Sequence, residues 1–384
     1  MNLLNFYFSL FELTVFVVLL LAFVHQLYFY IHYLAGILRH KNRVKKGEIK
    51  FLTKQPPVSV IIAAKDEEEN LLQFLPKILE QNYPEFEVIV INDASTDDTK
   101  TVLDQFKDKY PNLRTSFVPA GTRNISTKKL AITLGVKSAK HDILLFTDAD
   151  CFPESENWIA DMVRNFKPET EFVLAYGAYL PKEGFLNRLI SYDTLFIAMQ
   201  YMGMAIAGKP YMGVGRNLAY RKETFFNHNG FSTHLDILSG DDDLLVNKAC
   251  TSKNTTIETS KDSITWSEPK TSFRAWYHQK MRHLSSSKKY TGASKFRLIV
   301  EPFTRALFYL SLILAIVFGN LITLTAAAFL FLVRLTTQLI IVNNTSSLYH
   351  ERRYYATLPI LDIILPVLNL YAIIFGKKGK VKWK

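Results

Sequence analysis

Asp148 and Asp150 are two carboxylates separated by one small residue, and they follow the apolar run 143–146. A run of this kind is typical of a buried parallel strand. In an open α/β sheet, ligands bind just outside the carboxyl ends of the strands, so acidic side chains there face a ligand. Carboxylates on alternate residues can both offer oxygens to a hard divalent cation such as Mg²⁺ or Mn²⁺. Taken alone, the pair also fits an acidic turn that merely ends a strand.

Acidic and basic residues also follow two earlier apolar runs. The run 58–63 leads into Lys65 and Glu67, and the run 86–91 leads into Asp93. Between the runs, apolar residues recur at helical spacing, which predicts strands that alternate with helices. Such an alternation predicts an α/β fold with a mostly parallel sheet, covered by helices on both faces. The acidic groups then gather at one edge of that sheet.

The overall charge is positive, with 46 Lys and Arg residues against 35 Asp and Glu residues and a net charge of +11. The excess lies beside apolar segments, at 39–50, 270–297 and 377–384. Basic residues in those places favour an anionic membrane surface and phosphate substrates, and the sequence has no motif for binding nucleic acid. Cys151 and Cys250 lack metal-ligand spacing and form no disulfide framework, so a reducing, cytosolic setting is expected.

The first apolar segment, 3–38, is long enough to cross a bilayer, which takes about 20 residues. It lacks a basic leader and a small-residue cleavage site, which predicts a retained anchor rather than a removed signal peptide. The basic flank 39–46 follows directly, and the positive-inside rule places this flank and the domain after it in the cytoplasm. The sequence therefore predicts an integral protein of the cell (inner) membrane.

Two further apolar segments lie near the C-terminus. The segment 303–342 is too long for one comfortable span and predicts two helices in a hairpin. The segment 358–375 is interrupted by Asp362 and Pro366. Three full crossings after a cytoplasmic domain would put the basic tail 377–384 outside, against the positive-inside rule. Either 358–375 is interfacial or re-entrant, or 303–342 crosses only once.

The order of these motifs resembles that of the family 2 glycosyltransferases with the GT-A fold. The stretches that carry the resemblance are 60–70, 92–99, 145–150, 215–223, 240–244 and 279–283. The ordered set is more specific than any single motif. The resemblance implies a Rossmann-like, mostly parallel α/β domain in the cytoplasm with transmembrane helices at both ends. The expected divisions are an anchor at 1–38, a basic linker at 39–56, a GT-A domain at 57–300 and a C-terminal membrane region with a basic tail at 301–384.

The resemblance also implies a site for a nucleoside diphosphate sugar. The residues expected to contact this donor are Ala63, Lys65, Glu67, Asp93, Lys128, Asp148, Gln279 and Arg282. Asp148 and Asp150 are expected to hold a divalent cation, Mg²⁺ or Mn²⁺, which stabilises the charge on the departing diphosphate. Simpler roles stay open, because Glu67 and Asp93 suit helix N-termini and Lys128 suits the solvated start of a helix.

Asp241, Asp242 and Asp243 precede another apolar segment, and an acidic helix cap explains at least one of them. The resemblance makes one of the three the general base, which takes the proton of the acceptor hydroxyl in a single displacement that inverts the anomeric carbon. Matching the final Asp-Leu pair places the base at Asp241. The usual Glu of the family is Gly240 here, so Asp242 remains the alternative. Asp243 is expected on the acceptor side.

The stretch 279–283 matches the Gln-x-x-Arg-Trp motif of processive synthases except at its last residue, His283. The resemblance makes Arg282 a candidate for binding the diphosphate and His283 an acceptor-side residue. The loss of the Trp argues for short products. A basic amphipathic helix on the membrane surface is the alternative for this region, because aromatic residues alternate there with Lys and Arg.

These observations predict an inverting, metal-dependent glycosyltransferase. It would move a sugar from a UDP-sugar to an acceptor hydroxyl, on a lipid or a lipid-linked glycan, at the cytoplasmic face of the membrane. Its partners would be the donor, the acceptor and the lipid bilayer, without nucleic acid. Two alternatives stay open. One is a processive polysaccharide synthase, and the other is a non-catalytic scaffold of an envelope assembly complex that binds nucleotide sugars.

Overall fold

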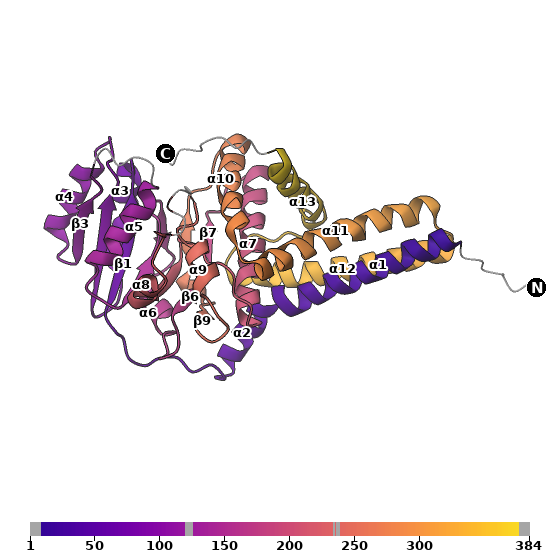
Figure 1. Ribbon diagram of the computed structural model, residues 1–384, viewed down its shortest axis with the longest axis horizontal. Helices are drawn as coiled ribbons and strands as arrows, with labels where there is room; N and C mark the ends of the chain where they lie inside the picture. Colours follow the sequence, from indigo (N-terminus) through magenta and orange to yellow (C-terminus); the bar gives the residue numbers. More distant parts are fainter. Residues whose placement is uncertain (1–8, 120–125, 233–234, 236–238, 376–384) are drawn as a thin grey trace, which may run out of the picture.

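The computed structural model describes residues 9–119, 126–232, 235 and 239–375, and it is built around a seven-stranded sheet (Figure 1). The strand order is β3-β2-β1-β4-β8-β6-β9, and β8 runs antiparallel to both of its neighbours. The strands are β1 (Val58–Ala64), β2 (Phe86–Asn92), β3 (Leu113–Phe117), β4 (Ile143–Phe146), β6 (Phe172–Leu174), β8 (Leu218–Arg221) and β9 (Thr255–Ile257). The predicted mostly parallel α/β sheet is therefore confirmed.

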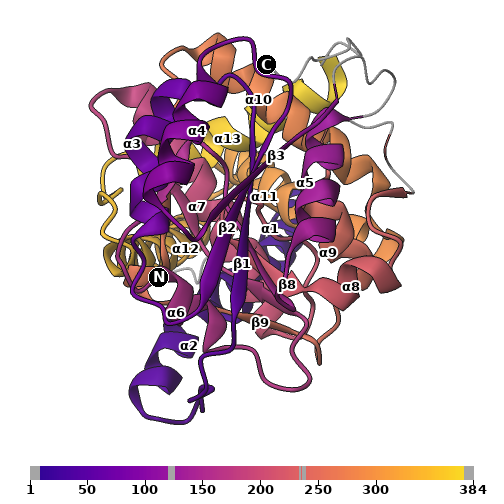
Figure 2. The same ribbon diagram turned by 90° about the vertical axis from the view of Figure 1, so that its left-hand side faces the viewer.

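Helices cover both faces of this sheet, as its alternating side chains require. Val60 and Ile62 of β1 pack in one core, whereas Ile61 and Ala63 pack in the other. Figure 2 shows α3, α4 and α6 on one side of the strands and α5, α8 and α9 on the other. These helices are α3 (Glu68–Leu79), α4 (Thr99–Lys109), α5 (Thr127–Ser138), α6 (Trp158–Val163), α8 (Lys222–Asn227) and α9 (Asp243–Ala249).

A second, three-stranded sheet has the order β5-β10-β7. Its strands are β5 (Cys151–Pro153), β7 (Gly177–Tyr179) and β10 (Thr265–Ser267). Because β5 begins one residue after Asp150, the chain passes from the large sheet into the small one across Asp148 and Asp150. The predicted metal-binding pair therefore lies at the junction of the two sheets.

Three long apolar helices extend side by side away from the sheets (Figure 1). They are α1 (Leu10–Phe29), α11 (Gly292–Phe318) and α12 (Leu321–Leu348). A π-helical turn, Tyr30–Leu34, and α2 (Gly36–Lys45) continue α1 toward the sheets. At the far end of this bundle, a Glu12 carboxylate oxygen accepts a hydrogen bond from the Asn320 backbone N–H at 3.0 Å.

Four segments of the described chain are long and apolar enough to cross a membrane: Leu10–Lys45, Phe185–Ile206, Gly292–Phe318 and Leu321–Leu348. The second of these is α7 (Phe185–Ile206), whose apolar window is 72% buried inside the protein. A Cβ added at Gly203 would lie 2.1 Å from the Tyr33 carbonyl oxygen, so glycine is needed where α7 passes the π-helical turn. Burial makes α7 part of the protein core between the sheets and the bundle.

The helices near the predicted domain divisions run past them. α2 continues beyond residue 38 to Lys45, and α11 begins at Gly292, ahead of residue 300, and runs through Pro302. The divisions followed changes in composition, whereas the first turns of α11 carry Lys295 and Arg297 beside the apolar residues. Two other helices complete the chain, α10 (Phe273–Ser286) and α13 (Leu358–Phe375).

Candidate functional site

The loops after β1 and β2 hold one another in an unusual conformation. Asp66 and Ala94 both adopt left-handed backbone angles, with φ of 51° and 50°. Such angles are costly for residues other than glycine and persist where surrounding contacts hold them. Here an Asp66 carboxylate oxygen accepts hydrogen bonds from the backbone N–H of Thr96, at 2.7 Å, and from its hydroxyl. The two strand ends thus form one fixed edge.

Three of the residues predicted to contact the nucleotide, Lys65, Glu67 and Asp93, lie along this edge. Asp93 is 1% exposed, and its carboxylate lies 3.8 Å from Lys65 Nζ. Burial raises the pKa of Asp93, although Thr127 and Lys65 oppose the shift. Glu67 immediately precedes α3 and accepts a hydrogen bond from Asn70 Nδ2 at 2.5 Å. Glu67 thus occupies the N-cap position of α3 at this edge, but in the described part of the chain its carboxylate accepts no capping hydrogen bond from the backbone of the helix.

Lys128, in the first turn of α5, joins two of the predicted acidic groups. Its Nζ lies 2.9 Å from Asp148 Oδ1 and 3.1 Å from Asp241 Oδ2. Burial disfavours the charged ammonium, but Asp148 and Asp241 outweigh it and raise the pKa of Lys128. Burial likewise disfavours ionised Asp148, but Lys128 lowers the pKa of Asp148 below its ordinary value. The ion pair therefore keeps both partners charged at neutral pH.

Asp148 and Asp150 are the candidate ligands for a hard divalent cation. One possible ligand atom each from Asp148, Asp150 and Cys151 lies within 4.8 Å of the others. Mg²⁺ and Mn²⁺ prefer carboxylate oxygens to sulfur. Burial raises the pKa of the Cys151 thiol, and the two carboxylates raise it further, so this thiol stays protonated. The donor set therefore reduces to the two carboxylates.

The three consecutive carboxylates before α9 have different surroundings. Asp241 pairs with Lys128, whereas both oxygens of Asp242 accept backbone hydrogen bonds, from Gly215 at 2.5 Å and from Asp243 at 2.7 Å. Burial, followed by the charges of Asp241 and Asp243, raises the pKa of Asp242 to about 7. Asp241 and Asp242 both line a cleft that is also lined by Lys128 and Asp148.

Asp243 lies behind the cleft, in the contact between α9 and α10. Its carboxylate accepts hydrogen bonds from the hydroxyls of Ser286, at 2.5 Å, and Tyr290, at 2.6 Å, and its side chain is buried. Both partners lie in or just after the helix that carries the 279–283 motif. Asp243 was predicted to lie on the acceptor side. In the structure its carboxylate holds that helix in place.

Arg216 is a site residue for which the sequence suggested no role. Its guanidinium stacks on the Tyr179 ring, 4.3 Å from the centroid, and Gln279 Nε2 donates a hydrogen bond to the Tyr179 hydroxyl at 2.9 Å. Gly177 leaves room for this arrangement, because a Cβ there would lie 3.1 Å from Arg216 Cβ. The charge of Arg216 helps to lower the pKa of Asp148. Its place in the 215–223 motif was the available signal.

α10 carries the other residues of the 279–283 motif and is fixed by a buried ion pair. Lys280 Nζ lies 2.7 Å and 2.5 Å from the two carboxylate oxygens of Asp193 on α7. Arg282 also helps to lower the pKa of Asp148, so its charge acts at the predicted metal site. His283 follows it and is exposed. Gln279 positions Tyr179, so its link to the site is indirect.

One cleft collects a subset of the predicted residues. Its lining includes Ala63, Lys128, Asp148, Asp241 and Asp242. Asp150, Arg282 and His283 lie outside this lining, as do the nucleotide-edge residues after β1 and β2. The cleft lies beside β1 and β4, where the strand order reverses, and ligands bind at such switch points in α/β sheets.

The structure is an α/β domain with an acidic cleft at the switch point of its sheet, and comparisons with known proteins show what it is similar to. Residues 59–226 match the family described as Glycosyl transferase family 2. This part of the chain is therefore similar to the family 2 glycosyltransferases.

Two curated relatives agree with this assignment. Glycosyltransferase AglE of Haloferax volcanii is 32% identical over 106 residues, which are 27% of this chain and 33% of that protein. Probable glycosyltransferase YdaM of Bacillus subtilis is 25% identical over 281 residues, which are 70% of this chain and 64% of that protein. The matches thus span less than two thirds of either relative.

A solved structure shares the fold. It is the mannosyltransferase PcManGT from Pyrobaculum calidifontis in complex with GDP-Man and Mn²⁺, with a TM-score of 0.58 and 18% sequence identity. The match covers 94% of this chain and all of that one. The likeness confirms the GT-A fold.

Proposed function

We propose that this chain is an inverting, metal-dependent glycosyltransferase. It transfers a sugar from a nucleoside diphosphate sugar, with UDP as the expected nucleotide, to a hydroxyl of a lipid or lipid-linked acceptor at the cytoplasmic face of a membrane. The observation that carries this proposal is the meeting of Asp148 and Asp241 at the Lys128 ammonium. A metal-site carboxylate and a candidate base thereby share one cleft.

On the donor side, Asp148 and Asp150 are the residues that would hold Mg²⁺ or Mn²⁺. A bound divalent cation would stabilise the negative charge that develops on the departing diphosphate. The positive charges of Arg216 and Arg282 lower the pKa of Asp148, so they would support the same leaving group. Lys65, Glu67 and the other residues at the ends of β1 and β2 would bind the base and ribose.

On the acceptor side, Asp241 is the proposed general base. It would accept the proton of the acceptor hydroxyl while that oxygen attacks the anomeric carbon and the bond to the β-phosphate breaks on the opposite face. Asp242 is the alternative base, but both of its oxygens already accept backbone hydrogen bonds. Asp242 therefore suits the role of fixing Gly215 and the loop that presents Asp241.

A membrane-bound acceptor is supported by the position of the cleft relative to the apolar helices. α10, whose Arg282 acts on Asp148, packs against α13, and α13 joins the bundle. The basic residues 39–50 lie between the first apolar helix and the sheet domain. By the positive-inside rule they favour a cytoplasmic catalytic domain.

The proposal is tested with purified protein, Mn²⁺ and a panel of UDP-sugars and GDP-sugars, by calorimetry for donor binding and by release of the nucleoside diphosphate. We expect binding and slow hydrolysis with a UDP-sugar, both lost on chelation of the metal. Asp150→Asn should lose metal-dependent binding. Asp104→Asn on the exposed side of α4 is the matched control and should behave as wild type. The absence of both binding and hydrolysis across the whole panel would refute the proposal. Product length on a gel separates single transfer, which His283 favours, from polymer synthesis.

A further inference from the structure

The last apolar helix, α13, lies at the base of the bundle rather than along it. In Figure 1, α1, α11 and α12 continue well beyond α13, which stays beside α10 and α7. An α-helix of 18 residues is about 27 Å long, close to the thickness of a bilayer core. Length alone would therefore allow α13 to cross, and its contacts decide the matter.

Both ends of α13 contact the catalytic half of the molecule. At its start, the Leu358 backbone N–H donates to the Tyr354 carbonyl oxygen at 2.8 Å, and the Tyr354 ring packs against Tyr192 of α7 with centroids 5.3 Å apart. Near its end, the Tyr371 ring lies 6.2 Å from the Tyr277 ring of α10. A helix with both ends against the same domain does not reach the opposite membrane surface.

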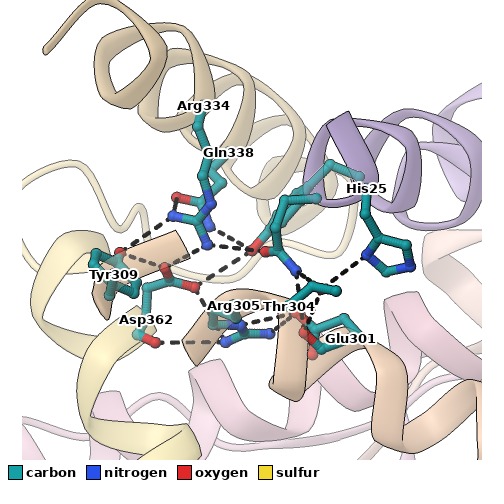
Figure 3. A network of polar contacts seen from close by, with 10 residues as sticks. His25, Glu301, Thr304, Arg305, Tyr309, Arg334, Gln338 and Asp362 are labelled. Carbon is teal, nitrogen blue, oxygen red and sulfur yellow. Dashed lines mark hydrogen bonds and ion pairs between the residues drawn. The ribbon is translucent and has the colours of Figure 1, made fainter. Parts of the chain in front are cut away.

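Between these ends, Asp362 fastens α13 to two helices of the bundle (Figure 3). Asp362 Oδ1 lies 3.1 Å from Arg305 Nη1, and Asp362 Oδ2 lies 2.9 Å from Arg334 Nη2. The Tyr309 hydroxyl donates to Oδ2 at 2.6 Å, and Glu301 pairs with Arg305. Two carboxylates thus balance two guanidinium groups, and Asp362 itself is fully buried.

The depth of this network follows from helix geometry. Arg305 lies about 13 residues before the end of α11 at Phe318, and Arg334 lies about 13 residues after the start of α12, which is about 20 Å along either helix. A bilayer core is about 30 Å thick. With one surface at the far end of the bundle, the core extends about 10 Å past the network toward the catalytic domain. Phe303 and Ile299 of α11 fall in this range and are 59% and 63% exposed.

The outer face of α13 has the same apolar character. Leu358, Leu361 and Leu365 face the protein and are buried, whereas Ile360, Ile363, Val367 and Leu370 are between 49% and 61% exposed. A helix that is apolar on all sides needs an apolar environment on each side. The protein supplies it on one side of α13, and acyl chains at the depth of Phe303 supply it on the other.

We infer that α13 is a re-entrant helix that lies in the membrane leaflet next to the catalytic domain, with its outer face against acyl chains, and does not cross the bilayer. Asp362 holds it there through Arg305 and Arg334. The chain then crosses three times, through α1, α11 and α12, and α13 ends on the side of the catalytic domain; the basic residues 377–384 follow it in the sequence. This arrangement agrees with the positive-inside rule.

The first test compares three positions in membrane vesicles of both orientations. A protease-cleavable peptide is added before Met1, after Lys384, or into the linker at Lys50, which precedes the catalytic domain. We expect the Lys384 and Lys50 sites to be cut in the same vesicle orientation and the Met1 site in the opposite one. Cleavage of the Lys384 site together with the Met1 site would overturn the inference. The comparison is relative, so it holds whichever side the catalytic domain occupies.

The second test measures depth by spin labelling. A nitroxide is placed at Val367→Cys, at Ile313→Cys in the exposed apolar part of α11, and at Asp104→Cys on the water-facing side of α4, each in a Cys250→Ala chain, since Cys151 is buried. Oxygen partitions into lipid, and a nickel chelate stays in water. We expect Val367 to resemble Ile313, with oxygen favoured several-fold over nickel. A Val367 label that resembles Asp104 would overturn the lipid contact.

Discussion

Lys128 in the cleft and Asp362 in the bundle each bridge two side chains of opposite charge, but their surroundings differ. The side chains around Lys128 retain contact with solvent: Lys128 itself is 18% exposed and Asp148 is 31% exposed. Around Asp362, the side chain of Arg334 is 1% exposed and that of Asp362 is 0% exposed. A ligand can therefore enter the first cluster and exchange partners there, whereas the second is closed.

The cleft and the bundle network also differ in how their charges are balanced. The bundle network pairs Glu301 and Asp362 with two arginines, so its charges cancel. In the cleft, Lys128 forms ion pairs with two carboxylates, and two more carboxylates, Asp150 and Asp242, lie close by. Buried charge without a partner is costly, and functional sites are where proteins retain it. The comparison assigns ligand chemistry to the cleft and a structural role to the bundle network.

The largest effect is expected from Asp241→Asn. Loss of a general base lowers the transfer rate by about 10³-fold. Lys128 retains its pair with Asp148, so donor binding should change by less than about twofold and the thermal unfolding temperature should stay near that of the wild type. Steady-state transfer, donor calorimetry and thermal unfolding measure the three quantities. Full activity of both Asp241→Asn and Asp242→Asn would remove the base from this segment.

The opposite pattern is expected from Asp362→Asn. Removal of one partner from a buried ion pair costs about 3–5 kcal/mol of stability, because Arg334 then loses its carboxylate partner while Arg305 keeps Glu301. Thermal unfolding in detergent should show the loss, while the transfer rate per folded molecule changes little. The double variant Asp362→Asn/Arg334→Gln removes the excess charge and should recover part of the stability. A slower enzyme with unchanged stability would place Asp362 in the reaction instead.

The strand-end carboxylates could be predicted from the sequence because continuous apolar runs and helical spacing indicate which residues share a sheet edge. Asp93, Asp148 and the strand ends after β1 and β2 follow from that rule. The edge strand β3 was not predicted, since only Leu113 in it is buried and its other side chains give no clear period. Its sequence is too polar to signal a strand.

Other features depend on contacts between distant segments. The stacking of Arg216 on Tyr179 and the hydrogen bonds from Ser286 and Tyr290 to Asp243 join residues that no local pattern connects. The orientation of α13 likewise depends on Asp362 finding two arginines on other helices. Composition identified each apolar segment, and only the fold shows which face meets the protein.

A smaller effect is expected from the loss of the hydrogen bond between Gln279 and Tyr179, the ring on which Arg216 stacks. Gln279→Ala and Tyr179→Phe each remove the same hydrogen bond, which is worth about 1 kcal/mol, so each should lower kcat/KM by about 5-fold. In a double-mutant cycle, the double variant should be little worse than either single one. Additive losses would show that Gln279 acts on the substrate directly and not through Tyr179.

The last prediction concerns pH and again contrasts two regions. Burial raises the pKa of Asp242 in the cleft to about 7, and burial also raises the pKa of Glu351, in the loop between α12 and α13, to about 7. Ionised Asp242 accepts the backbone hydrogen bonds that fix the loop presenting the proposed base, so transfer should fall about tenfold per unit as pH drops below 7. The contribution of these carboxyl groups to folding stability has the opposite dependence on pH. A carboxyl group whose pKa is raised in the folded state stabilises that state at low pH, and this contribution is lost as pH rises through 7.

Two variants separate the two carboxyl groups. Asp242→Asn should abolish the acid limb of kcat/KM and leave a low rate that hardly varies with pH. Glu351→Gln removes the other group of similar pKa, which is not among the residues lining the cleft, and should keep the limb while it removes part of the pH dependence of unfolding. A limb that survives in Asp242→Asn and disappears in Glu351→Gln would move the titrating group to the base of the bundle. The loop that carries Glu351 would then be coupled to the cleft through Tyr176, the residue that links Glu351 to the strands beside the cleft.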